Sequence, residues 1–165
     1  MKNYILTQAV AGKKLRRMAY EILENNPGDQ QLILAGIKDS GSVIARNIQR
    51  HLQEIAGDKL TTRLIEISLD KKKPGVVTLS ESLPFDDAVI IIIDDVAMSG
   101  KTLLYAMKPF LDFHPRKIET LVLVERSYKA FPVQPDYKGL SLSTTLQEHI
   151  YVEVDGEAVK GAWLE

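Results

Sequence analysis

Two adjacent aspartates and a small-residue turn lie close together in the middle of the chain. The stretch from Ala88 to Thr102 reads AVIIIIDDVAMSGKT, an apolar run that ends in Asp94 and Asp95 and is followed by a Ser-Gly-Lys-Thr turn. Carboxylates accept hydrogen bonds from sugar hydroxyls and bind divalent cations. Backbone N–H groups in a turn that opens a helix bind phosphate. A vicinal diol beside a phosphate is a ribose 5-phosphate, so the stretch predicts a site for that group.

Other anion-binding motifs fit this stretch less well. A P-loop would carry glycine five residues before Gly100, where this chain has Asp95, so a P-loop is excluded. No G-x-G-x-x-G dinucleotide fingerprint occurs. The remaining alternative is a solvated loop in which Asp and Ser only cap a helix.

The segments around this stretch alternate between strand and helix patterns. Apolar or β-branched runs predict strands over 31–36, 61–69, 88–93 and 118–125, and a terminal hairpin from 151–154 and 161–164. Helical spacing predicts helices over 7–25, with Thr7 as the N-cap, and over 42–55 and 102–113. The polar segment 70–87 reads as a flap or hairpin. This order is typical of an α/β open sheet, whose ligands bind outside the carboxyl ends of the strands, here at 36–41, 70–87, 94–101 and 125–133.

Length and composition indicate a single cytoplasmic domain, residues 1–165. Apolar residues make up 45% and charged residues 26% of the 165 residues, and the net charge is −1. This charge gives no global nucleic-acid footprint. The absence of Cys excludes disulfides, thiolate catalysis and Cys-based metal sites. The first residues lack the apolar region of a signal peptide, and no apolar run approaches the ~20 residues that span a bilayer.

The apolar strand with DDVAMSGKT resembles the motif of type I phosphoribosyltransferases that binds 5-phosphoribosyl 1-pyrophosphate (PRPP). Most of the chain is similar to the branch of bifunctional pyrimidine-operon regulators and uracil phosphoribosyltransferases, through KLRRMAYEILENN, LILAGIKDSGSVIAR, FPV, DYKG and VEVDG. The resemblance implies an α/β type I phosphoribosyltransferase fold, a mostly parallel open sheet flanked by helices with a flexible flap and a small hood. It implies transfer of phosphoribose from PRPP to a nucleobase, with uracil giving UMP, release of pyrophosphate, and Mg²⁺ as the cofactor.

Site residues follow from the resemblance, position by position. Asp94 and Asp95 would hold the ribose hydroxyls and, with Lys38, act in catalysis, while Asp95 would bind the metal, directly or through water. The PRPP-binding stretch would be Asp94, Asp95, Val96, Ala97, Met98, Ser99, Gly100, Lys101 and Thr102. The pyrophosphate loop would be Lys38, Asp39, Ser40 and Gly41, under a flap that carries Lys71, Lys72 and Lys73. The base end would comprise Met98, Glu125, Arg126 and Ser127.

Several positions depart from the family pattern. Purine-salvage members carry an acid at the place of Met98, which cannot transfer a proton, so Met98 disfavours hypoxanthine and guanine. The regulator branch has Tyr there and Arg at the place of Ser40. Basic or His positions of its RNA-contacting surface are Tyr20, Gln134 and Leu140 here, while Lys129 keeps its charge. Two alternatives therefore stay open, a nucleotide-sensing RNA-binding regulator and a non-catalytic PRPP- or nucleotide-binding domain. A homodimer is expected in each case.

Overall fold

A six-stranded sheet forms the centre of the molecule, with strands in the order β4-β3-β2-β5-β6-β7. The structure is a computed structural model that describes residues 1–28, 31–145 and 147–165. The strands are β2 (Gln31–Ile37), β3 (Thr61–Ser68), β4 (Thr78–Leu79), β5 (Val89–Ala97), β6 (Lys117–Arg126) and β7 (Tyr137–Leu142). All neighbouring pairs are parallel except β3 and β4, which are antiparallel. The carboxyl ends of the parallel strands therefore share one edge.

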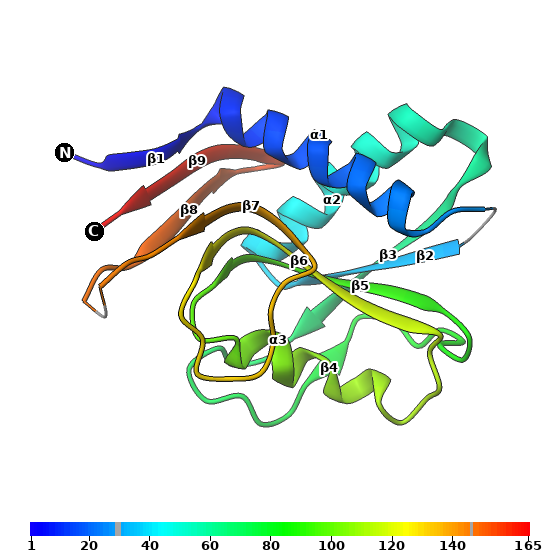
Figure 1. Ribbon diagram of the computed structural model, residues 1–165. Coiled ribbons are helices and arrows are strands. Elements are labelled where there is room, and N and C mark those ends of the chain that lie inside the picture. Colours follow the sequence, from blue (N-terminus) through cyan, green and yellow to red (C-terminus); the bar gives the residue numbers. More distant parts are fainter. Residues whose placement is uncertain (29–30, 146) are drawn as a thin grey trace.

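Helices cover both faces of this sheet (Figure 1). Helices α1 (Gln8–Asn25) and α2 (Ser40–Ala56) pack on one face, and α3 (Lys101–Ala106) with the short 3₁₀ turn Lys108–Phe110 lies on the other. Ile91 and Ile93 of β5 point into the first core, while Ile90 and Ile92 point into the second. This double coverage explains why β5 is an unbroken apolar run.

A second, three-stranded sheet forms the hood, in the order β1-β9-β8. Its strands are β1 (Asn3–Thr7), β8 (Ile150–Asp155) and β9 (Ala158–Leu164), and both pairs are antiparallel. The chain thus starts and ends in the hood, next to the carboxyl ends of β5 and β6 (Figure 1).

Most predicted elements are present with small shifts at their ends. The Thr7 side chain accepts a hydrogen bond from the Val10 backbone N–H, which confirms it as the N-cap of α1. The terminal hairpin is confirmed as β8 and β9. Segment 70–87 contributes one short strand, β4, and otherwise runs as a loop that we call the flap. Among the described residues, no helix combines the length and apolar character needed to span a bilayer.

Other predictions about elements were wrong. The strand predicted to end at residue 93 continues through the two aspartates to Ala97, because β6 pairs with it as far as Glu125. The helix predicted over 102–113 ends at Ala106, and the chain continues as a 3₁₀ turn that contains Pro109, which cannot donate a helical hydrogen bond. Strands β1 and β7 were missed, since they are short edge strands of mixed polarity.

Candidate active site

The acid pair lies at the carboxyl end of β5, between the sheet and the flap. Asp94 is 1% exposed, and its Oδ2 is buried without a hydrogen-bond partner. Its Oδ1 accepts from the Asp95 backbone N–H at 2.9 Å and from Lys71 Nζ of the flap at 2.9 Å. Lys71 Nζ also lies 3.4 Å from Asp95 Oδ1. One flap ammonium therefore bridges both carboxylates.

Burial controls the charge of this pair. Removal from water, with a smaller effect from the repulsion of Asp95, raises the pKa of Asp94 to about 8 against the opposing attraction of Lys71. Burial lowers the pKa of Lys71, but the attraction of the two carboxylates outweighs this effect and raises the pKa overall. Because the three groups titrate together, the pair holds less negative charge than two free aspartates. A cation bound at this site would favour the ionised form of both carboxylates.

The phosphate loop, residues 97–102, follows directly. Gly100 adopts φ +85°, and a Cβ there would lie 3.2 Å from the Val133 carbonyl oxygen. The Ser99 carbonyl accepts from the N–H groups of Ala130 and Phe131 at 3.1 and 3.0 Å. This carbonyl is thus engaged by the loop after β6, away from any anion that the loop amides would bind. Since α3 has only six residues, the loop amides rather than a helix dipole are the expected donors.

The predicted pyrophosphate loop lies against the acid pair. It follows β2 and opens α2, whose N-cap Asp39 has φ +75° and makes no side-chain capping bond. A Cβ at Gly41 would lie 2.8 Å from the Ile93 carbonyl oxygen and 3.2 Å from Asp94 Oδ1, so only glycine permits this close packing. The uncapped N–H groups of the 17-residue helix α2 therefore start beside Asp94. The Lys38 side chain is exposed.

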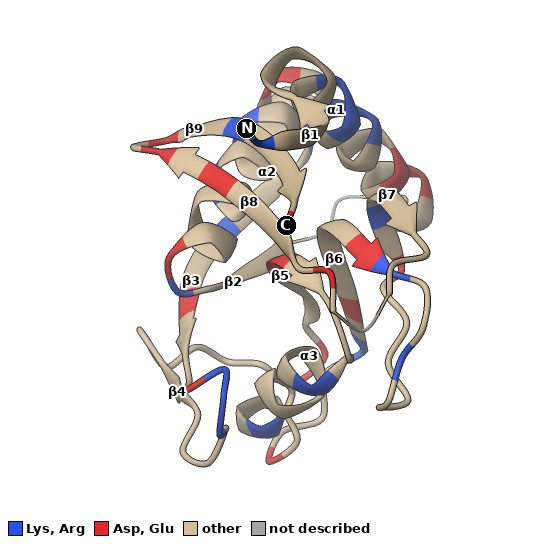
Figure 2. Cartoon of the chain, turned by 90° about the vertical axis from the view of Figure 1, so that its left-hand side faces the viewer, with Lys and Arg blue, Asp and Glu red and all other residues tan. Residues whose placement is uncertain are grey.

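A cleft of about 500 Å³ joins these elements. Figure 2 shows the basic flap segment beside β4. Residues of the flap and of the carboxyl end of β5 line this cleft. Its lining comprises Lys71, Lys72, Asp94, Asp95, Val96, Ala97, Met98, Ser99, Gly100, Lys101, Thr102, Leu103, His149, Ile150, Tyr151 and Val152. All the predicted PRPP-binding residues are thus brought together. Residues 38–41 and 125–127 do not line this cleft.

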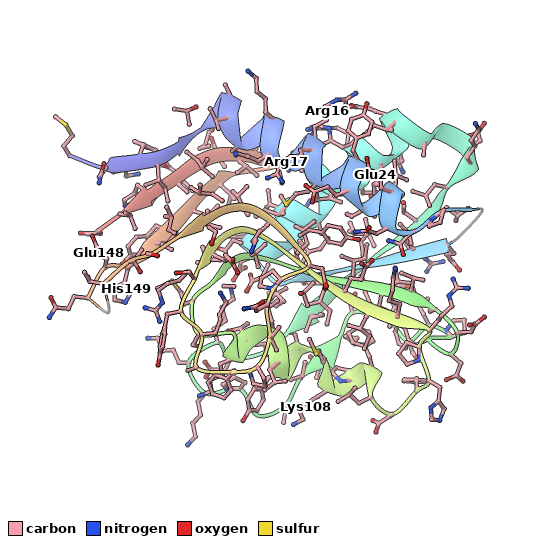
Figure 3. The ribbon with its side chains drawn as sticks, viewed as in Figure 1. Arg16, Arg17, Glu24, Lys108, Glu148 and His149 are labelled. Atoms are coloured by element: carbon pink, nitrogen blue, oxygen red, sulfur yellow. The ribbon has the colours of Figure 1, made fainter. Side chains whose placement is uncertain are left out.

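Sequence reasoning missed the contribution of the hood strand β8. His149, labelled in Figure 3, lies immediately before β8 and exchanges two backbone hydrogen bonds with Glu165, at 2.7 and 3.0 Å. In an antiparallel pair every second residue exchanges such bonds, so the peptide groups of Ile150 and Val152 point away from β9. Because β8 is the last strand of the hood sheet, these groups lie on its free edge, along the cleft.

Glu125, expected at the base end, has a different environment. The residue is 4% exposed, and its carboxylate accepts from Lys129 Nζ at 3.0 Å, Lys138 Nζ at 2.8 Å and Ser141 Oγ at 3.0 Å. Burial opposes ionisation, but the two lysines and the serine outweigh it and lower the pKa of Glu125. The side chain thus makes three hydrogen bonds within the protein, which tie the loop after β6 to β7, and its predicted contact with a base stays a prediction. Arg126 Nε is buried without a partner, and Ser127 is exposed.

The acid pair fits a divalent cation that is shared with a substrate. Over the described ranges, no group of three or more His, Cys, Asp or Glu side chains is placed to hold a metal by protein ligands alone. Mg²⁺ usually binds through one or two carboxylates together with waters and substrate phosphates. The unpartnered Oδ2 of Asp94 and the Lys71 ammonium at the mouth of the pair are consistent with a cation site of this kind.

Comparisons with known proteins agree with this architecture. Residues 3–157 match the phosphoribosyl transferase domain family. Bifunctional protein PyrR from Staphylococcus carnosus is 34% identical over 94% of this chain and 95% of its own length, and that from Halalkalibacterium halodurans is 32% identical over 94% of each.

Solved structures share the fold at low identity. The hypoxanthine phosphoribosyltransferase of Trypanosoma cruzi superposes with a TM-score of 0.79 at 14% identity, over 99% of this chain and 96% of that one. A hypoxanthine-guanine phosphoribosyltransferase from Bacillus anthracis gives 0.72 at 19% identity, over 91% and 85%. With the α/β sheet, the flap and the hood in place, the chain belongs to the phosphoribosyltransferase family.

Proposed function

We propose that the protein transfers 5-phosphoribose from PRPP to uracil, giving UMP and pyrophosphate. The observation that carries this proposal is an acid pair, the buried Asp94 and the partly exposed Asp95, that shares one cleft with the phosphate loop 97–102. Two carboxylates suit a vicinal diol, and adjoining loop amides suit its phosphate. Family membership supports the reaction type, and the resemblance to the uracil branch supports the base.

The reaction follows from where charge develops. Loss of pyrophosphate from C1 of the sugar creates positive charge on the ribose and negative charge on the leaving group. Asp94 and Asp95 accept the ribose hydroxyls and stabilise the positive ring. The N–H groups at the start of α2, which lie beside Asp94 through Gly41, take negative charge on the pyrophosphate. Mg²⁺, when bound with the substrate, supplies further neutralisation of the leaving group.

The free edge of β8 is the proposed binding site for the base. The backbone N–H and C=O groups of Ile150 and Val152 match the alternating N–H and C=O groups of uracil, without any motif in the sequence. Met98 lines the same cleft and offers an apolar contact but no proton. A purine would leave its N7 without a donor or acid at this position, which supports a pyrimidine. The expected contacts of Arg126 and Ser127 with the base remain predictions.

The test is turnover on a panel of bases. The protein is incubated with Mg²⁺, PRPP and, separately, uracil, orotate, hypoxanthine, guanine or xanthine, and pyrophosphate and nucleotide are quantified. Formation of UMP alone is expected. A purine nucleotide would refute the assignment of the base while leaving the sugar site intact. PRPP binding without turnover on any base would favour the non-catalytic binding domain.

The RNA-binding alternative gains no specific support from the geometry. The side chain of Lys129, the retained basic position, is 8% exposed and donates to Glu125 and to the Arg126 carbonyl. A cation turned inward does not neutralise phosphates on an RNA, which is the main source of such affinity. Titration with a pyrimidine-leader RNA at two salt concentrations tests this alternative directly. The homodimer is likewise proposed, and sedimentation velocity would test it.

A further inference from the structure

We propose that Lys71 is an internal occupant of the cation position at the acid pair. Its ammonium holds Asp94 and Asp95 in the free protein and is displaced when a divalent cation arrives, so that loading of the site releases the flap. The freed Lys71 then moves onto the pyrophosphate leaving group. This inference rests on the proposed function for the last step only, since displacement by a cation requires no catalysis.

The contacts of the acid pair show that Lys71 occupies the Oδ1 atoms of both carboxylates. Asp94 Oδ1 accepts from both Lys71 Nζ and the Asp95 N–H, each at 2.9 Å. Asp95 Oδ1 accepts from the Val96 N–H at 2.8 Å and lies 3.4 Å from the same ammonium. A cation or a sugar hydroxyl that approaches these two oxygens therefore competes with Lys71 for them.

The strength of the Lys71 contact suits a temporary role. The Lys71 side chain is 44% exposed, so its ammonium keeps part of its hydration and exchanges the carboxylates for water at low cost. Asp94 is almost fully buried, so without a cation the pair would place two like charges together in a low-dielectric site. The ammonium of Lys71 thus neutralises the carboxylates in the free protein and can still leave them when a divalent cation binds.

The flap supplies the path for this movement. Asp70 Oδ1 accepts from the N–H groups of Lys72 and Lys73 at 2.9 and 3.3 Å, which forms a tight turn around Lys71. The next anchor is the Gly75 carbonyl, which accepts from Lys108 Nζ at 3.0 Å; Figure 3 labels Lys108 on the α3 side of the molecule. Lys71 lies between these two anchors, on a stretch without strand pairing, so its release frees a short segment rather than the whole flap.

The released Lys71 lies near the place where the pyrophosphate is proposed to bind, at the start of α2. The start of α2 packs on the carboxyl end of β5 through Gly41, where an added Cβ would lie 3.2 Å from Asp94 Oδ1. A pyrophosphate held by the N–H groups of α2 therefore lies next to the present position of the ammonium. The incoming cation replaces the charge of Lys71 at the acids, and Lys71 adds its charge to the leaving group. The total positive charge around the substrate rises when the bond to C1 breaks.

The test measures a metal ion alone. Mn²⁺ binding is followed by electron paramagnetic resonance and calorimetry, without PRPP or nucleobase, for wild type, Lys71→Met, Lys71→Arg and Lys72→Met. Lys71→Met is expected to bind Mn²⁺ at least about fivefold more tightly, because the competing ammonium is gone. Lys71→Arg keeps a competitor and is expected to stay near wild type. Lys72→Met removes an equal charge from the lining of the same cleft and is expected to change affinity less than about twofold.

Hydrogen exchange of the flap gives a second readout. In wild type, Mn²⁺ is expected to accelerate exchange at the backbone N–H groups of residues 71–73, whereas Lys71→Met should exchange fast with or without the metal. Equal Mn²⁺ affinity in wild type and Lys71→Met would overturn the inference, even if UMP formation proceeds normally. A Mn²⁺ effect in a protein that turns over no base would support displacement and refute the proposed reaction instead.

Discussion

Two lysine–carboxylate clusters lie at the ends of adjacent strands, and they are built in opposite ways. At the end of β5, one half-exposed lysine serves two carboxylates, and one buried oxygen has no partner. At the end of β6, two lysines and a serine serve the single carboxylate of Glu125. The first cluster has fewer ammonium groups than carboxylates, while the second has more ammonium groups than carboxylates.

The difference separates a binding site from a structural clamp. Burial raises the pKa of Asp94 to about 8, because one lysine cannot offset both the desolvation and the second acid. The pKa of Glu125 falls although it too is buried, because its partners outweigh the desolvation. Binding of a cation stabilises a site whose carboxylates are incompletely neutralised. A carboxylate that already has enough cationic partners is not stabilised further. Chemistry is therefore expected at Asp94 and Asp95, and rigidity at Glu125.

Removal of the acid pair should have the largest effect. The double variant Asp94→Asn/Asp95→Asn is expected to lose PRPP affinity by at least about 100-fold, because hydrogen bonds to charged groups contribute about 1.5–3 kcal/mol each. Calorimetry with PRPP and Mg²⁺ measures this, and circular dichroism checks the fold. Glu125→Gln serves as the matched control, with less than about tenfold loss. Wild-type affinity in the double variant would place the sugar site elsewhere.

The next largest effect should be on stability, at Glu125. Glu125→Gln leaves two ammonium groups without their carboxylate and is expected to cost about 3 kcal/mol at pH 7. Since the folded pKa lies below the ordinary value of 4.5, the contribution of the carboxylate is present above that pH and disappears as the pH falls through the folded value. Urea denaturation at pH 7 and pH 3 measures both points. An unchanged deficit at pH 3 would contradict a charge-based clamp.

The two lysines of the clamp should differ in importance. Lys129 is 8% exposed and reaches both Glu125 and the Arg126 carbonyl, so Lys129→Met is expected to cost about 2 kcal/mol. Lys138 is 49% exposed, so Lys138→Met should cost less than about 1 kcal/mol. Both variants remove one charge from the same carboxylate. Equal losses of unfolding free energy would show that the inward turn of Lys129 adds nothing.

The smallest effect should have the opposite sign. The folded pKa of Asp94, about 8, lies above its ordinary value near 3.8, so the ionised acid destabilises the fold increasingly as pH rises between these values. Asp94→Asn should therefore melt at a higher temperature than wild type at pH 8.5, and at nearly the same temperature near pH 4. Melting curves across this range provide the measurement. A difference that does not vary with pH would mean that burial does not perturb Asp94.

Local sequence patterns determined much of this protein. The unbroken apolar run of β5 needs two covered faces, and the helical spacing of α1 with its Thr7 cap acts over neighbouring residues only. The acid pair and the phosphate turn are contiguous in the chain, so strand geometry alone brings them to one edge of the sheet. For these features, local backbone preference and burial give the same answer, and the sequence predicts them without knowledge of the fold.

Tertiary structure alone decided which charges meet. Lys71 reaches Asp94 across 23 positions, Lys138 reaches Glu125 across 13, and β8 borders the cleft from a hood that contains both ends of the chain. The sequence of three flap lysines does not indicate which of them forms an ion pair with a carboxylate. The presence of a lysine at position 129 does not indicate that its side chain is buried against Glu125. Long side chains have many rotamers, and their partners depend on the path of loops and the packing of separate sheets. No pattern of neighbouring residues encodes that outcome.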